Sequence, residues 1–315
     1  MQNIVLESTK EIVNNSKHVK VNKENLIRFA ESLKDKELKH WLAEIPFDLS
    51  KLNSYQKLHF LLVLNSISFC YWAGDNEKKW AIEYKGNNYD GAKGMIACIG
   101  RAIEEGIPIL NPYFLKDIKS EDLSHIFRGN TTIPLFEERL NILRELGKIL
   151  IEKYNGNFEN FINKSSLDVQ DMLDRLLLDF LYFVDKHLFQ DKEVHFHKRA
   201  QLLLSDIHEQ HTPLKNTHKL TACADYKIPY VLRRLNIFEY SKELENNINT
   251  TKPLDKGSIY ELELRANTIH TINEISKLIN IESRKINDYL WLLAQEEELK
   301  EEKNSRYHRV RTTDY

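Results

Sequence analysis

The sequence predicts a mostly α-helical protein with one small antiparallel β-hairpin, and three observations support this fold class. Apolar residues recur at helical spacing through most of the 315 residues. Helix start and stop residues frame several segments, as in 134–156, which has Pro near its start, Glu in its first turn and Gly at its end. Strict alternation of apolar and polar residues is clear in one stretch, 78–91. We therefore expect a large helical protein with a hairpin inserted in it.

The individual elements follow from the same patterns. Residues 3–43 have helical periodicity, and the run 58–72 is apolar on nearly every face, which predicts a buried helix. In the hairpin, Trp80, Ile82 and Tyr84 alternate with polar residues ahead of a turn at Gly-Asn-Asn. Further helices are expected over 134–156, 167–184, 197–211, 229–237, 268–279 and 282–302.

In terms of domains, we expect three parts. An N-terminal helical part covers 1–75, the hairpin covers 76–91, and a helical part that carries the functional site covers 92–315. These parts form one integrated domain or two closely packed lobes. The stretch 242–257 is rich in Lys and Asn, which predicts a surface connection.

Composition excludes several classes of protein. With 42% apolar residues the chain can bury a substantial core, so disorder is not expected. A total of 45 Lys and Arg against 47 Asp and Glu provides no global attraction to nucleic acid. The three cysteines are far apart, which argues for reduced thiols. No secretory signal or membrane-spanning apolar run occurs, so we expect a soluble cytoplasmic protein without a membrane partner.

Asp225 is a candidate for a functional carboxylate. It lies in TACADYKIPYVLRRL, ahead of Pro229, which fits the first turn of a helix. We expect that helix to begin at Pro229, which leaves Asp225 in the preceding loop and too far ahead to be an ordinary N-cap. The small side chains of Ala222, Cys223 and Ala224 would let a flat ligand approach the carboxylate.

Two further segments are candidates for ligand binding. Asn287, Asp288 and Trp291 are close enough in sequence to share one face of a helix. The alternative is that Asp288 is a solvated first-turn residue and Trp291 a core side chain. Lys198 and Arg199 open a helix whose apolar run would hold them, and a fixed basic side chain can bind a phosphate. Lysines at such positions usually face solvent, so both interpretations stay open.

The histidines suggest a metal site, but a structural interpretation is favoured. His195, His197, His208 and His211, together with Asp206, have spacings compatible with a divalent metal. The first two alternate as strand or loop residues do, and the last two lie near the polar end of a predicted helix. No glycine-rich phosphate-binding loop and no G-x-S-x-G motif occurs. We therefore expect neither a metal nor an organic cofactor.

Seven segments, taken in order, resemble the queuosine 5′-phosphate N-glycosylase family of queuine salvage. The resemblance covers roughly residues 60–315, and the first 60 residues fit more loosely. Asp225 followed by a helix ending in Arg-Arg-Leu-Asn is also similar to the aspartate before a helix in helix-hairpin-helix DNA glycosylases, which implies a fold of DNA-glycosylase-like character. The segments are WAIEYKGNNYDG, GRAIEEGIPI, PLFEERLNILRELGKILIEKYNG, FHKRAQLLLSD, ADYKIPYVLRRL, DYLW and RYHRVR.

This resemblance implies hydrolysis of the N-glycosidic bond of queuosine 5′-phosphate, which releases queuine and ribose 5-phosphate for tRNA modification without a cofactor. Cleavage builds positive charge on the ribose, so an ionised Asp225 near the sugar would stabilise the transition state more than the ground state. Asp225 could also orient water or add transiently to the sugar carbon. Two alternatives stay open: a hydrolase of another modified nucleoside or nucleotide, and a non-catalytic helical protein that binds nucleic acid.

The chain departs from the family pattern at three places. An aspartate of the base pocket stands four residues before the Trp of the "LW" pair in the family, whereas this chain has Asn287 there and Asp288 beside it. Either residue could contact the base. Cys223 replaces an aromatic residue two positions before Asp225, although its sulfur can still pack on a ring. A histidine expected after the N-terminal Trp has no clear equivalent, although His40 is nearby.

The phosphate-binding residue is expected in one of two matching segments. Lys198, at the head of its helix, is the first candidate, and His308, Arg309 and Arg311 of RYHRVR are the alternatives. The resemblance implies a small-molecule substrate and no stable nucleic-acid partner.

Overall fold

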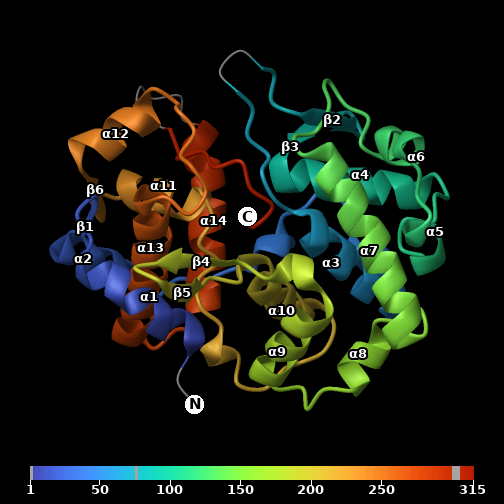
Figure 1. The fold of residues 1–315 in the computed structure, drawn as a ribbon, viewed down its shortest axis with the longest axis horizontal. Helices are drawn as coiled ribbons and strands as arrows, with labels where there is room; N and C mark the ends of the chain where they lie inside the picture. The colour runs from blue at the N-terminus through green and yellow to red at the C-terminus, as the bar shows by residue number, and fades with distance from the viewer. Residues whose placement is uncertain (1–2, 75–76, 300–305) are drawn as a thin grey trace.

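The computed structural model describes residues 3–74, 77–299 and 306–315. Within these residues the chain forms 14 α-helices and three two-stranded antiparallel sheets, so the mostly α-helical fold class is confirmed. Figure 1 shows two groups of helices on either side of the region where the chain ends at its C-terminal label. None of the described helices combines the length and the apolarity that crossing a membrane would need.

The first group of helices, at the left of Figure 1, is centred on α13 (Ile259–Ile279). Ser258 caps the N-terminus of α13 by accepting the N–H of Glu261, and Asn280 ends the helix in the left-handed conformation. Because other helices pack against it on several sides, most of its side chains are buried. The other members of this group are α1 (Ile4–Asn14), α2 (Lys23–Leu33), α11 (Lys227–Arg234), α12 (Lys242–Asn249) and α14 (Ser283–Leu299).

The second group, at the right of Figure 1, packs around α3 (Ser54–Ile67). Asn53 and Gln56 form a capping box at the start of α3, and every residue from Leu58 to Ile67 is buried. The prediction of a buried helix here is confirmed, although the helix ends five residues earlier than expected. The other members of this group are α4 (Gly91–Glu104), α5 (Pro112–Lys116), α6 (Ser120–Ile126), α7 (Phe136–Tyr154), α8 (Glu159–Asn163), α9 (Val169–Asp179) and α10 (Lys198–Gln210).

The predicted hairpin is present as β2 (Ala81–Tyr84) and β3 (Asn87–Asp90). Its turn consists of Lys85 and Gly86, both with positive φ, rather than the expected Gly-Asn-Asn. A two-residue turn with two positive φ angles matches the twist of the flanking strands, which explains the tighter loop. Residues 87 and 88 consequently pair in the second strand.

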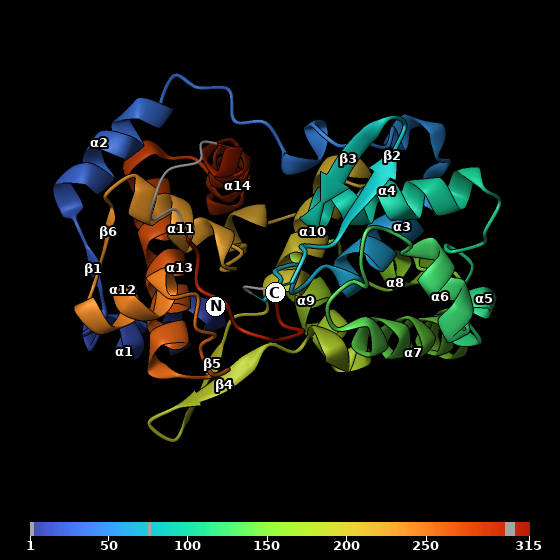
Figure 2. The ribbon, with the colours of Figure 1, turned by 90° about the horizontal axis from the view of Figure 1, so that it is seen from above.

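Two further strand pairs were not predicted from the sequence. The hairpin of β4 (Lys186–Phe189) and β5 (Lys192–His195) has little apolar alternation, and Figure 2 shows it extending beside the two helical groups. The pair of β1 (Val19–Val21) and β6 (Phe238–Tyr240) joins segments about 220 residues apart. Strands of three residues carry too little periodicity to be recognised, and their pairing depends on the tertiary fold.

Two other segments differ from expectation. The stretch 242–257 contains α12, which Ser241 caps by accepting the N–H of Leu244, so it is more than a surface connection. The expected helix over 229–237 instead spans Lys227–Arg234. This earlier start matters for the functional site. The division of the chain into parts at residues 75 and 92 stays a prediction.

Candidate functional site

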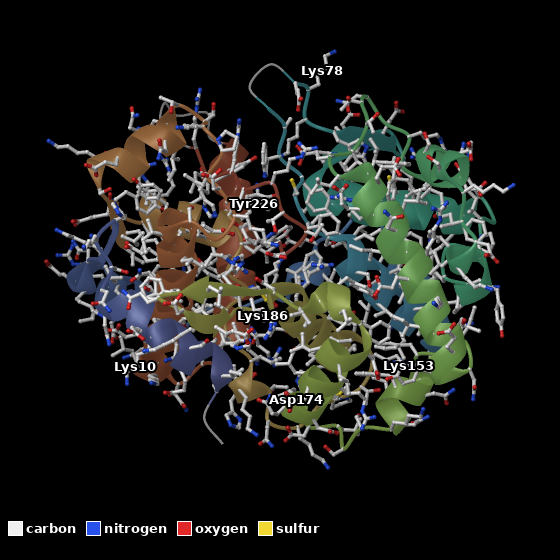
Figure 3. The ribbon with its side chains drawn as sticks, viewed as in Figure 1. Lys10, Lys78, Lys153, Asp174, Lys186 and Tyr226 are labelled. Carbon is white, nitrogen blue, oxygen red and sulfur yellow. The ribbon has the colours of Figure 1, made fainter. Side chains whose placement is uncertain are left out.

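A pocket of about 720 Å³, its solvent-open part included, lies between the two groups of helices. The first group contributes the start of α11 and one face of α14, and the second contributes the segment after α3 and the first turns of α10. Figure 3 shows Tyr226, one of the lining residues, near the middle of the molecule. The pocket is therefore assembled from segments that are far apart in sequence.

Asp225 lines this pocket and is held by the helix that follows it. Its Oδ1 accepts the backbone N–H of Lys227 at 2.8 Å and of Ile228 at 3.2 Å. α11 begins at Lys227, two residues earlier than expected, and its N-cap residue is Tyr226 rather than Asp225. Asp225, one position further ahead, nevertheless caps the helix end through these two bonds. The cap fixes the carboxylate at the positive end of the helix dipole.

Six of the sequence-predicted site residues line the pocket, whereas the basic candidates His308, Arg309 and Arg311 do not. His308 is buried against Tyr315, and burial, together with the charge of Arg265, lowers its pKa to about 3. The guanidinium of Arg309 lies 5.8 Å from the ring centre of Trp72. Neither His308 nor Arg309 is among the residues that line the pocket. The six that do are Lys198, Cys223, Asp225, Asn287, Asp288 and Trp291.

Asn287 and Asp288 have different partners. Asn287 Oδ1 accepts the backbone N–H of Cys223 at 2.9 Å, so this carbonyl anchors the segment that leads to Asp225. Asp288 is 2% exposed. Burial raises its pKa to about 7, the neighbouring His40 opposes this rise, and the negative charge of Asp206 adds to it. The Asp288 carboxyl therefore titrates close to neutral pH, whereas the Asn287 amide carries no titratable proton.

Behind Asp288 lies His40, which caps a short 3₁₀ helix at Trp41–Ala43. Its Nε2 is 3.5 Å from Asp288 Oδ2 and 3.3 Å from Asp206 Oδ1. Burial lowers the pKa of His40, but a hydrogen bond to Asp206 and the charges of Asp206 and Asp288 outweigh this effect and raise it. His40 thus links the pocket to a carboxylate in the core.

Aromatic side chains form much of the pocket wall. Trp41 and Trp291 contact each other edge to face, with ring centres 5.3 Å apart. Phe69 and Tyr71, from the segment after α3, also line the pocket. Tyr226, beside the catalytic candidate, packs on Tyr307 with ring centres 4.8 Å apart. Such walls suit a planar heterocycle, because aromatic faces stack on it.

Basic side chains line the pocket as well. Lys198 is 7% exposed, and its backbone N–H donates to Asp185 Oδ2 at 3.3 Å, which fixes the first turn of α10. Lys227 is also 7% exposed, and its Nζ lies 5.2 Å from the ring centre of Tyr307. Lys79 forms an ion pair with Asp90 at 3.0 Å. An anionic group on a ligand therefore has lysines within the pocket.

Sequence reasoning missed several of these lining residues. Lys227 and Tyr226 directly follow Asp225, so their adjacency was an available signal. Trp41, Phe69 and Tyr71 carried no local signal, because a tryptophan or an aromatic residue in an apolar run is as readily a core residue. These three aromatic residues come together in one pocket only because the two groups of helices pack against each other.

The histidines of the metal-site hypothesis are used elsewhere. His195 and His197 contact each other, His208 accepts the N–H of Leu214, and His211 contacts Ser54. A different group, Asp185, His187 and Asp314, has ligand atoms close enough for a metal. Arg265 and Lys256 already neutralise these carboxylates with bonds of 2.5 to 2.9 Å, so the group is a buried ion network rather than a vacant metal site.

The fold and the site together define a helical protein with an enclosed pocket whose walls are aromatic, acidic and basic, a pocket suited to a small planar ligand that carries an anionic group. Comparison with known proteins narrows this class. The family model described as queuosine salvage protein matches residues 49–315, and the chain belongs to this family.

Relatives with assigned names cover most of the chain. A protein of Sphaerobacter thermophilus is 34% identical over 82% of this chain and 81% of its own length. One of Mus musculus is 30% identical over 98% of both chains, and one of Schizosaccharomyces pombe is 28% identical over 93% of this chain and 91% of its own. All three are named queuosine 5′-phosphate N-glycosylase/hydrolase.

Proposed function

We propose that this chain is an N-glycoside hydrolase that cleaves queuosine 5′-phosphate to queuine and ribose 5-phosphate. Family membership and the names of the relatives support the substrate class. The observation that carries the mechanism is the position of Asp225, a capped carboxylate that lines a pocket with aromatic walls. The names of the relatives favour hydrolysis over the alternative of a non-catalytic protein that binds nucleic acid.

Asp225 is the catalytic residue in this proposal. Loss of the base leaves positive charge on the ribose ring, and a fixed carboxylate beside the ring stabilises that charge without reorganisation. Both of its helix bonds end on Oδ1, so Oδ2 is the oxygen that faces the sugar. One such electrostatic group contributes on the order of 3 to 4 kcal/mol to lowering the barrier. The same oxygen serves either to orient the attacking water or to add to the sugar carbon.

The rest of the substrate fits the two ends of the pocket. The planar base stacks within the aromatic wall that includes Trp291 and Trp41, and Asp288 contacts its polar edge. Asn287 has a structural role instead, because its carbonyl is bonded to the backbone of Cys223. The 5′-phosphate binds Lys198, as charge complementarity requires.

One experiment tests the function. Purified protein is incubated with queuosine 5′-phosphate, and free queuine is measured by mass spectrometry. We expect release of queuine by the wild type and a loss of about a hundredfold or more in Asp225→Asn. Absence of queuine release by a folded wild-type protein would refute the proposed substrate.

A further inference from the structure

His40, Asp206 and Asp288 come from three separate elements and meet behind the pocket. His40 Nε2 lies between the two carboxylates, 3.3 Å from Asp206 Oδ1 and 3.5 Å from Asp288 Oδ2. Their side chains are 10%, 0% and 3% exposed. Two carboxylates that approach one imidazole away from water are costly to bury unless the three groups share their protons. We call these residues the acid triad.

The surrounding hydrogen bonds assign a role to each member of the acid triad. Trp41 Nε1 donates to Asp206 Oδ1 at 2.8 Å, and Asn65 Nδ2 donates to Asp206 Oδ2 at 2.7 Å, so both oxygens of Asp206 are acceptors. The backbone N–H of Leu42 donates to His40 Nδ1 at 3.3 Å. The ring proton of neutral His40 is therefore on Nε2, which faces the two carboxylates.

The acid triad holds one mobile proton. With Asp206 as the acceptor, this proton resides either on His40 as an imidazolium or on Asp288 as a carboxylic acid, and the net charge is −1 in both forms. The N–H of Leu42 disfavours the imidazolium, because His40 Nδ1 would then carry a proton of its own. Burial of Asp288 favours the acid form further, in keeping with its pKa of about 7. The charges of Asp206 and Asp288 raise the pKa of His40 and so favour the imidazolium. The form with a neutral His40 and a protonated Asp288 is the one that can donate a proton into the pocket.

We infer that the acid triad supplies the proton that the departing base takes up, with Asp288 as the donor in the pocket and His40 and Asp206 as its positioning residues. This inference rests on the proposed function. A 7-deazaguanine has no N7 to protonate, so the electron pair of the breaking C1′–N bond makes the base anionic. The proton of the Asp288 carboxyl passes to the base and neutralises it. The water that adds to C1′ loses one proton, and this proton restores Asp288.

Few other charged groups lie around the acid triad, and most of these are paired with a group of opposite charge. The charge of Arg284 in α14 lowers the pKa of Asp288, and the charge of Glu209 in α10 raises the pKa of His40. Arg284 and Glu209 also form an ion pair with each other. On the pocket side, the opposite charges of Lys198 and Asp225 act on the thiol of Cys223, as the charges of Asp288 and Asp206 do. Cys223 lies among them as a neutral thiol, because burial raises its pKa well above the usual range. Asp288 therefore responds mainly to His40 and Asp206.

Single-turnover release of queuine, measured from pH 5 to 9, tests the role of the acid triad. If Asp288 acts as the acid, the wild-type rate falls as pH rises through an apparent pKa near 7, because the protonated form is lost. Asp288→Asn keeps a hydrogen-bond donor but has no transferable proton, so we expect a rate about a hundredfold lower and no fall above pH 7. His40→Gln removes the alternative form in which an imidazolium holds the proton and Asp288 is ionised, so the fall moves to higher pH.

Controls separate this inference from a structural role and from the proposed function. Glu296→Gln, an exposed acid-to-amide change on the same helix, should reproduce the wild-type profile. A uniform loss of rate in His40→Gln with an unshifted profile would mean that His40 only supports the fold. If Asp288→Asn retains the wild-type rate and profile, the acid triad is not the proton source although the function stands. If the wild type itself releases no queuine, the proposed function fails first.

Discussion

At the scale of single residues, Asp225 combines two roles that its position in the chain makes compatible. Its Oδ1 caps α11 through Lys227 and Ile228, and the residue also lines the pocket. Capping a helix removes the rotational freedom of the carboxylate, so the group is oriented before the substrate binds. The same bonds make Asp225 part of the local stability of the fold.

Substitutions at Asp225 should separate these two roles. Asparagine is as good a cap as aspartate, whereas alanine is not, so Asp225→Ala should lower the free energy of unfolding by about 1 kcal/mol and Asp225→Asn by much less. Both should lower the rate of queuine release by about a hundredfold or more, because neither carries a negative charge. Urea unfolding and the mass-spectrometric assay measure the two effects. If Asp225→Asn retained the wild-type rate, the negative charge of Asp225 would have no part in the mechanism.

Lys198 should determine the preference for the phosphorylated substrate. Its side chain lines the pocket at the head of α10, and a lysine binds phosphate as a point charge. We expect Lys198→Ala to raise KM for queuosine 5′-phosphate about tenfold or more and to leave the kinetics with unphosphorylated queuosine nearly unchanged. Steady-state assays with both substrates measure this preference.

Exposed Lys148 provides the matched control, since Lys148→Ala removes a lysine that does not line the pocket. An unchanged preference for the phosphorylated substrate in Lys198→Ala would point to another basic residue of the pocket, such as Lys227.

At the scale of elements, the packing of α5 on α7 depends on Gly147. A Cβ added at Gly147 would lie 2.6 Å from the backbone oxygen of Pro112 and would also collide with the backbone of Lys116. Backbone atoms of a short helix cannot move aside as the end of a side chain can. This close approach explains why a glycine interrupts an otherwise strong helical pattern in α7.

Gly147→Ala should therefore destabilise the protein although alanine has the higher helix propensity. We expect a decrease in the free energy of unfolding of about 1 to 3 kcal/mol, measured by urea denaturation. Lys148→Ala, at the adjacent exposed position, should change it by less than about 0.5 kcal/mol. If Gly147→Ala and the wild type had the same free energy of unfolding, α5 and α7 would be able to move apart without loss of stability.

Local signals predicted some elements well and others poorly. Asn22 caps α2, and Gly106 follows α4 with positive φ, and both residue types are common local signals of helix ends. The start of α11 was misplaced because proline is also tolerated within the first turn, so Pro229 alone did not identify the first residue. The pairing of β1 with β6 had no local signal, since its register depends on α2 and α13 being in place.

At the scale of the whole molecule, a buried ion network joins the β4–β5 hairpin, α13 and the C-terminal segment. Arg265 donates to both oxygens of Asp185, and His187 lies 3.6 Å from Asp185 and 3.4 Å from Asp314. Tyr315, next to Asp314, lines the pocket and donates its O–H to Glu261 at 2.9 Å. The network therefore holds one wall of the site in position.

His187 should make the stability of the protein depend on pH. Burial lowers its pKa, but hydrogen bonds to Asp185 and Asp314 outweigh burial and raise it to about 9, above the value of about 6.5 in an unfolded chain. The stabilisation is complete below about pH 6.5 and is lost as pH rises through about 9. We expect the free energy of unfolding to fall over this range, with His187 contributing up to about 3 kcal/mol of the decrease.

Urea unfolding at pH 6.5 and pH 9 measures this contribution. His187→Gln should show a smaller decrease than the wild type, whereas His125→Gln, at a side chain that is 58% exposed, should match the wild type. If the free energy of unfolding of His187→Gln and of the wild type decreased equally between the two pH values, groups other than His187 would cause the decrease.

Local patterns in the chain predict the helical class, the hairpin over 78–91 and the candidates Asp225, Asp288 and Lys198, because periodicity, turn residues and ordered motifs are local properties. The three-dimensional packing is needed to place the Asn287 carbonyl on the backbone of Cys223 and to bring His40 and Asp206 behind Asp288. Those relations depend on burial and on contacts between residues up to about 250 positions apart, and neither quantity is encoded in any single segment.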